Sequence, residues 1–209
     1  MTRCFAGLIA IFMVAACGAL PNVAAATAAD VSIKPGDLPS GMQRCELSGD
    51  VDSYLNSIKT KDPATYATTK KEWEDAQKNG ATAAQVVFYT DSAANCASVQ
   101  SKVANISSAT YKLVVNFVVQ FKDEASAAKG FTSGKIFGFN RALLKNGGAT
   151  EGTKTGLGAN SIVLSVPIAN QVFYIAVWQN KAFMVILGVI NIDAATGQKA
   201  AAAENMRIH

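Results

Sequence analysis

The sequence predicts an α+β fold, in which a mostly antiparallel sheet of about five strands is flanked by helices. β-type runs follow one another in the last third of the chain with short polar turns between them, as in an antiparallel meander. Earlier β-type runs end at an aspartate and continue into alanine-rich segments typical of helices. The 180 residues from 30 to 209 suit one hydrophobic core, so we expect a single domain over this range.

Residues 1–29 have the pattern of a secretory signal peptide. Arg3 precedes a charge-free apolar stretch over residues 5–20, and the small-residue tract 24–29 follows. An anchoring transmembrane helix would need about 20 apolar residues, which is longer than this stretch. We therefore expect an extracytoplasmic protein.

The leader also contains a lipidation motif. Residues 14–17 read Val-Ala-Ala-Cys and fit the lipobox of bacterial lipoproteins, in which the cysteine is lipidated and becomes the N-terminus. Use of Cys17 would leave residues 18–29 as a tether and anchor the domain to the outer face of the cell membrane. Cleavage near residues 26–29 would instead release a secreted protein. The sequence leaves both routes open.

Charge gives no indication of a nucleic-acid partner. Arg3 is the one charged residue in the leader, so the formal net charge of the chain falls from +4 to +3 when residues 1–29 are removed. The lysines are scattered among acidic residues and do not form a basic stripe. The expected partners are an envelope protein, a small apolar ligand, or the membrane through lipidated Cys17.

The two cysteines that follow the leader, Cys45 and Cys96, predict a disulfide. An even pair in an oxidising compartment usually forms a bridge. Two separate buried thiols and a metal pair are the alternatives. A zinc site would need four ligands, and the sequence has one histidine, the terminal His209. We expect no metal and no cofactor.

The first elements are expected to be helices. Residues 30–47 contain several prolines and glycines and read as an irregular lead-in. Asp50 can cap a short helix, whereas Asp62 and Pro63 form the start signal of a longer one that ends before Gly80.

A short repeat then marks the passage from strand to helix. Residues 86–93 and 118–125 align with a spacing of 32, and both join a β-type run to an alanine-rich segment through an aspartate. Asp91 and Asp123 are the aspartates, and Asp193 has the same place before the final helix. We expect all three to accept hydrogen bonds from first-turn N–H groups, which is a structural role.

The remaining strands follow from hydrophobic periodicity. Residues 111–121 are apolar at every odd position, which predicts a strand buried on one face, and residues 161–168 alternate similarly. Residues 172–178 and 182–190 are apolar on both faces and should be central strands of the meander.

Catalytic residues are not evident. The one histidine is terminal, and both mature cysteines are expected to be bridged. A pair of carboxylates is the remaining route, and would have to come from a set of dispersed acids: Glu46, Asp50, Asp52, Glu72, Glu74 and Asp75.

Residues 131–139 are the best candidate for a ligand-facing element. Phe131, Phe137 and Phe139 lie there beside two glycines, and mobile glycines next to aromatics could form a lid over an apolar pocket. The alternative is that these aromatics seal an edge of the sheet. Trp178, on a predicted central strand, is a further ligand-binding candidate, with a core position as its alternative.

Several of these segments resemble a known group of proteins. They are Asp-Leu-Pro-Ser-Gly at 37–41, the strand-to-helix turn at 118–129, Gly-Leu-Gly at 156–158 and the final strand and helix. They resemble uncharacterised extracytoplasmic lipoproteins and sensor domains of Gram-positive bacteria with a PsbP-like fold, over most of residues 85–208. The resemblance implies an antiparallel sheet flanked by helices and a binding role. The resemblance leads us to expect acidic residues after position 158, but this chain has Ala-Asn-Ser there. No site residue of the group is therefore assigned to this chain.

These observations favour a non-enzymatic envelope domain that binds a small apolar ligand or a partner protein. The alternatives are a carboxylate-dependent hydrolase and a passive surface protein without a specific ligand. A hydrolase of this kind would need two acids within about 5–10 Å inside a cleft.

Overall fold

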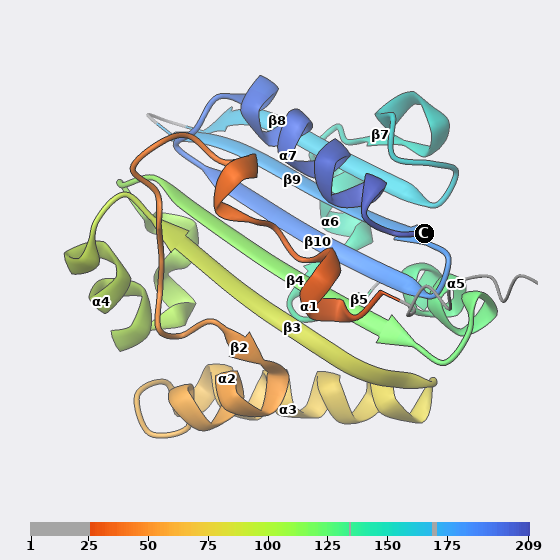
Figure 1. Ribbon diagram of the computed structural model, residues 1–209, viewed down its shortest axis with the longest axis horizontal. Coiled ribbons are helices and arrows are strands. Elements are labelled where there is room, and N and C mark those ends of the chain that lie inside the picture. Colours follow the sequence, from red (N-terminus) through yellow and green to blue (C-terminus); the bar gives the residue numbers. More distant parts are fainter. Residues whose placement is uncertain (1–25, 134, 169–170) are drawn as a thin grey trace, which may run out of the picture.

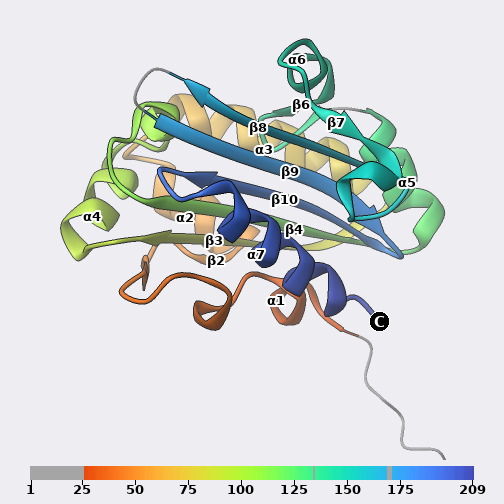
Figure 2. The same cartoon turned by 90° about the horizontal axis from the view of Figure 1, so that it is seen from above.

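The computed structural model describes residues 26–133, 135–168 and 171–209. The chain forms one antiparallel sheet with helices on both faces, in a single domain (Figures 1 and 2). This confirms the predicted α+β class. The predicted signal peptide lies outside the described residues up to position 25, and so does Cys17.

The sheet has the order β1-β3-β4-β10-β9-β8-β7, and β2 also pairs with β3. Five strands are eight residues or longer, in agreement with the predicted number, and three two-residue strands extend the edges. The bounds are β1 (Gln43–Arg44), β2 (Gly49–Asp50), β3 (Ala81–Thr90), β4 (Leu113–Phe121), β7 (Thr150–Glu151), β8 (Ser161–Ile168), β9 (Gln171–Asn180) and β10 (Phe183–Ile190). The predicted meander is present as β8, β9 and β10.

Helices cover both faces of the sheet. Figure 2 shows α1 and α7 on one face and α3 and α6 on the other. No helix of the described ranges is long and apolar enough to cross a membrane. The bounds are α1 (Ala28–Val31), η1 (Pro35–Asp37), α2 (Val51–Ile58), α3 (Pro63–Lys78), α4 (Ala93–Ser101), η2 (Val103–Ser108), α5 (Glu124–Ser133), α6 (Arg141–Asn146), η3 (Gly152–Thr155) and α7 (Ala194–Met206). A separate hairpin joins β5 (Lys135–Ile136) to β6 (Phe139–Asn140).

Aspartates begin four of the helices, as predicted. Asp50 precedes α2, Asp62 precedes α3, Asp123 precedes α5 and Asp193 precedes α7. Each carboxylate accepts a hydrogen bond from the backbone N–H three residues further on, at 2.7–3.2 Å. These bonds satisfy N–H groups that have no partner inside the helix. Hydrogen bonds lower the pKa of all four carboxyls, the largest contributions coming from the Ser53 N–H to Asp50, the Ala104 N–H to Asp62, and the side chains of Ser126 and Thr196 to Asp123 and Asp193.

The expectation that Asp91 caps α4 is wrong. The cap is Ser92, whose Oγ accepts a hydrogen bond from the Asn95 N–H at 3.2 Å. Asp91 Oδ1 accepts instead from Asn95 Nδ2 at 2.6 Å. Serine and aspartate are comparable caps, so the neighbouring residue took the position that the repeat assigned to Asp91.

Strand β4 is buried on both faces, which corrects the predicted half-buried strand. Asn116, expected to face solvent, is completely buried. Its Oδ1 accepts from the Ile33 N–H at 3.1 Å, and its Nδ2 donates to Glu204 Oε2 at 3.2 Å. Because the Asn116 amide has these hydrogen-bond partners, its burial leaves no unpaired polar group. This explains why a polar side chain is tolerated at this position.

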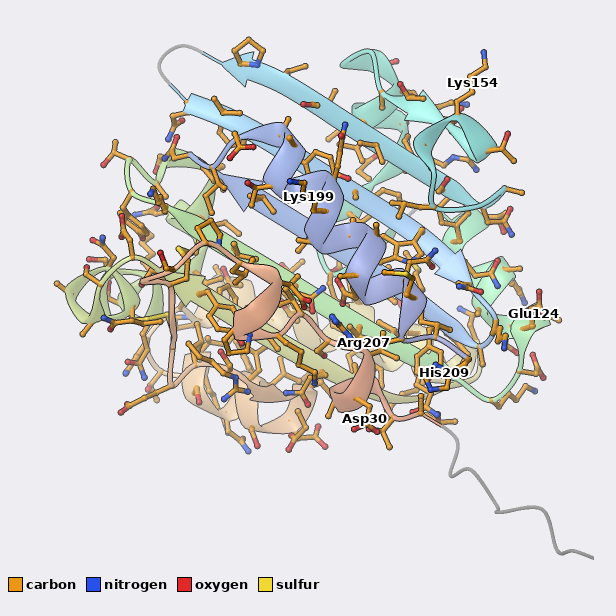
Figure 3. All side chains as sticks on the ribbon, turned by 45° about the horizontal axis from the view of Figure 1, so that its top comes forward. Asp30, Glu124, Lys154, Lys199, Arg207 and His209 are labelled. Carbon is orange, nitrogen blue, oxygen red and sulfur yellow. A yellow bond between two sulfur atoms is a disulfide. The ribbon has the colours of Figure 1, made fainter. Side chains whose placement is uncertain are left out.

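The segment before Asp30 belongs to the folded body. Ala28 and Val31 of α1 are buried, and Thr27 and Asp30 form a reciprocal capping box at the start of this helix. Arg207, just after α7, fixes the same segment by an ion pair with Asp37 at 2.8 Å. Figure 3 shows Arg207 between the end of α7 and this N-terminal segment.

Candidate functional site

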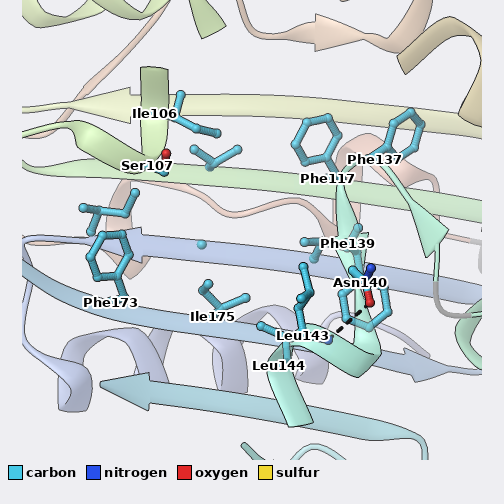
Figure 4. Close-up of a pocket in the computed structure, with 15 residues that line it drawn as sticks. Ile106, Ser107, Phe117, Phe137, Phe139, Asn140, Leu143, Leu144, Phe173 and Ile175 are labelled. Atoms are coloured by element: carbon cyan, nitrogen blue, oxygen red, sulfur yellow. Dashed lines mark hydrogen bonds between the residues drawn. The ribbon is translucent and has the colours of Figure 1, made fainter. Parts of the chain in front are cut away.

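An apolar pocket of about 330 Å³ lies on the face of the sheet that α3 and α6 cover. Its floor comes from β4, β9 and β10, and its cover comes from the β5–β6 hairpin and α6. Figure 4 shows Phe173 towards one end of the pocket and Phe117 and Phe137 side by side at the other. The lining residues are Ile106, Ser107, Val115, Phe117, Phe137, Gly138, Phe139, Asn140, Leu143, Leu144, Phe173, Ile175, Ile186, Gly188 and Ile190.

Gly188 forms the middle of the floor. It pairs with Val115 of β4 on one side and with Ile175 of β9 on the other. An added Cβ would meet no atom closer than Val115 O, at 3.9 Å, so the space above this residue is open. Glycine weakens a strand interior and often marks a place where a ligand or another backbone approaches closely. We call this cavity the Gly188 pocket.

The cover is made of a short helix and a hairpin. In α6, Leu143 is 66% exposed although it lines the pocket, so an apolar side chain lies at its mouth. The helix begins at Asn140, whose Oδ1 accepts a hydrogen bond from the Leu143 N–H at 3.2 Å, drawn as a dashed line in Figure 4. The Asn140 side chain is therefore engaged in capping, which leaves the pocket with few free polar groups.

No acidic, basic or histidine side chain is among the residues that line the Gly188 pocket in the described chain. Ser107 and Asn140 are its polar members. Such a lining offers no general base or metal ligand, but it suits an apolar molecule held by packing and by removal from water.

The structure brings two of the four predicted ligand-binding residues together. Phe137 and Phe139 line the pocket. Phe131 is buried in α5, beneath the Arg141 guanidinium, 5.1 Å from the ring centroid. Trp178 is completely buried on the opposite face of the sheet, in the core beneath α7. Ligand binding by Phe137 and Phe139 stays a prediction.

Sequence reasoning missed the floor of the pocket. Gly188, Ile186 and Ile175 belong to the strands predicted over residues 172–178 and 182–190, whose apolar residues are expected to lie in the core. The signal in the sequence is a single glycine inside the apolar run 183–190, which is unusual in a central strand.

The predicted disulfide is present between Cys45 and Cys96. It joins the segment after β1 to α4, and both cysteines line a separate cavity that shares no lining residue with the Gly188 pocket. Within the described ranges, no cluster of three or more potential metal ligands is found.

Acidic residues do not gather in the cavities described. The Gly188 pocket has none, and three other cavities have one each: Glu46, Glu72 and Glu124. Glu204 is a fully buried carboxyl on the side of α7 that faces the sheet, on the face opposite the Gly188 pocket, and its Oε1 has no hydrogen-bond partner among the described residues. Burial raises its pKa to about 8, although the hydrogen bond from Asn116 acts against this shift.

Comparison with known proteins gives little guidance. No protein-family model matches the chain, and no curated protein sequence matches it. Among solved structures, the crystal structure of the extracellular domain of PknH from Mycobacterium tuberculosis is similar, with 10% sequence identity and a TM-score of 0.48. The match covers 86% of this chain and 93% of that one. At this TM-score the likeness carries no inference, and the predicted resemblance to PsbP-like proteins stays a prediction.

Proposed function

We propose that this chain is a non-enzymatic extracytoplasmic domain that binds a small apolar ligand in the Gly188 pocket. The observation that carries the proposal is Gly188 itself, which leaves open space in a central strand beneath an aromatic cover. The volume of about 330 Å³ falls within the range of small-molecule sites.

The alternatives have less support from the arrangement of residues. A carboxylate-dependent hydrolase needs two acids in one cleft, whereas each of the cavities described has at most one. A partner protein could contact the exposed Leu143, but one exposed leucine is a small surface for a stable interface. A passive surface protein gives no reason for the open space at Gly188 beneath an aromatic cover.

Replacing Gly188 with valine is expected to abolish or strongly weaken binding of an apolar probe. The new side chain would occupy the floor, and β-branched residues suit a strand, so the fold should be retained. A tenfold loss corresponds to about 1.4 kcal/mol, less than the contribution of two buried methylene groups. The measurement is the fluorescence titration of N-phenyl-1-naphthylamine, for which we expect at least tenfold weaker binding by Gly188→Val.

Gly36→Val is the matched control. An added Cβ at Gly36 meets no atom within 4 Å, and this residue lies in η1 and does not line the pocket. This variant should bind the dye as the wild type does. Failure of the wild-type chain to bind the probe at a single saturable site, or equal binding by Gly188→Val, would contradict the proposal.

The extracytoplasmic location is supported by the disulfide, because such bridges persist in oxidising compartments. We propose export through the predicted leader, with the domain either anchored through lipidated Cys17 or secreted. Among cleavage points near residues 26–29, one before Thr27 would keep the capping box of α1.

Intact-mass measurement of the protein from its native host separates these routes. We expect either a diacylglycerol-modified N-terminus at Cys17 in the membrane fraction or a free N-terminus at Thr27 in the secreted fraction. An unprocessed N-terminus at Met1 would overturn the export proposal.

A further inference from the structure

A second cavity, of about 360 Å³, adjoins the Gly188 pocket. The two share four lining residues: Ile106, Phe117, Phe137 and Gly138. The far side of the second cavity is formed by α3, which contributes Thr65, Thr68, Thr69 and Glu72. We call it the α3 cavity. At the hairpin between β5 and β6, the apolar Gly188 pocket therefore meets a cavity whose α3 wall contains threonine hydroxyls and whose other walls are mostly apolar.

Phe137 lies where the two cavities meet. Its ring stacks on Phe117, with centroids 5.0 Å apart, and on Trp73, at 6.2 Å. The residue has a φ of 48°, and Gly138 after it has a φ of 75°, so the hairpin turn is left-handed at both central positions. Asparagine or glycine usually fills the first of these positions, and a bulky residue there is strained. Packing against Phe117 and Trp73 compensates for this strain.

The hairpin is also fastened to α3. The Gly138 N–H donates a hydrogen bond to Glu72 Oε2 at 2.9 Å, and this bond is exposed to solvent. Breaking it costs little, because water can replace either partner. This hydrogen bond therefore opposes movement of the hairpin away from α3 only weakly, and the stack of Phe137 on Trp73 is the contact that such a movement must break.

The polar groups of the α3 cavity define what could bind there. The Thr65 hydroxyl already donates to Asp62 Oδ2 at 2.8 Å, so the Thr68 and Thr69 hydroxyls and the Glu72 carboxylate are the groups that can hold hydroxyl groups of a ligand. No lysine or arginine is among the lining residues of either cavity in the described chain. An anionic head group would thus lose water without gaining a cationic partner, beside a carboxylate of the same sign.

We propose that the ligand of the Gly188 pocket is a neutral amphiphile with a single alkyl chain and a hydroxylated head group. The alkyl chain lies over Gly188, the head group lies against the threonines of α3, and the Phe137 ring moves aside to let one molecule occupy both cavities. This inference rests on the proposed function and adds the chemical class of the ligand.

The expected affinities follow from this arrangement. Each additional methylene group buried in the Gly188 pocket should strengthen binding by about fourfold until the pocket is full. An anionic head group on the same chain should bind at least about tenfold more weakly than a neutral hydroxylated one.

The test uses alkyl glucosides from hexyl to dodecyl and alkyl sulfates of the same lengths, below their micelle concentrations. Binding is followed by the fluorescence of Trp73, which stacks on Phe137. Trp178, the other tryptophan, lies on the opposite face and is replaced by phenylalanine in all proteins. We expect a change in Trp73 emission, affinity that rises with chain length, and a preference for glucosides.

Two further variants test the place of the head group. Thr68→Val should reduce the preference for glucosides over sulfates, because it removes a hydroxyl from the α3 cavity. Thr132→Val, on the exposed surface of α5 and outside both cavities, should leave this preference unchanged.

The outcomes separate failure of the amphiphile assignment from failure of the proposed function. Sulfates that bind as tightly as glucosides, or glucoside binding that leaves Trp73 emission unchanged, would overturn the amphiphile assignment and leave the apolar pocket in place. If no alkyl compound and no naphthylamine dye bound, the proposed function would fail as well.

Discussion

Replacing both Cys45 and Cys96 with serine is expected to lower the free energy of unfolding by about 4 kcal/mol. The disulfide spans 51 residues, and a bridge over that length restricts the unfolded chain considerably. For a domain of this size the loss corresponds to a fall in melting temperature of roughly 8–16 °C. Urea unfolding of wild type and double variant, under oxidising conditions, measures the difference.

Reduction of the wild-type protein is the internal control for this result. The reduced wild type should unfold close to the double variant, because both lack the same covalent link. The bridge lies outside the Gly188 pocket, so dye binding by the folded variant should persist. Equal urea midpoints for the oxidised wild type and the variant would refute a stabilising bridge.

Replacing Glu204 with glutamine is expected to remove a large pH dependence of stability. In the unfolded chain this carboxyl loses its proton near its ordinary pKa of 4.5, whereas in the folded protein it keeps the proton until about pH 8. Folding therefore takes up a proton between these values, and wild-type stability falls as pH rises, by up to about 1.4 kcal/mol per pH unit. Glutamine does not titrate, so its contribution is independent of pH.

The charged groups around Glu204 have smaller effects than its burial. Arg207 and Lys34 act to lower its pKa, and Asp37 acts to raise it. Glutamine can keep the hydrogen bond from Asn116, since its amide oxygen also accepts. Urea unfolding of both proteins at several pH values between about 5 and 8 should show a stability difference that shifts in favour of the variant as pH rises. A constant difference would contradict a buried neutral carboxyl.

The strands and helix starts could be predicted because they depend on local pattern. Period-two alternation located the strand over residues 111–121, and Asp62 followed by Pro63 located the start of α3. The burial of both faces of β4 could not be predicted in this way. Asn116 bonds to Ile33 and Glu204, which lie 83 and 88 residues away in sequence, and no window of local sequence contains these partners.

The candidate site was only partly predictable for a similar reason. Aromatics beside glycines over 131–139 indicated a ligand-facing element, and two of the three phenylalanines do line the pocket. The open floor depends on which residues of β4 and β9 lie beside Gly188, and this follows from sheet register. Trp178 lies on the opposite face because strand residues alternate between the faces of the sheet, and the sequence does not say which face has the pocket.

The most direct test of ligand binding at Gly188 is an NMR measurement of contacts between a bound alkyl glucoside and isoleucine methyl groups. Ile175 and Ile186 line the pocket, whereas Ile33 and Ile208 are buried in the core on the other face of the sheet. We predict intermolecular NOEs from the alkyl chain to Ile175 and Ile186 and none to Ile33 or Ile208. Saturable binding without NOEs to Ile175 and Ile186 would contradict the assignment of this pocket as the binding site.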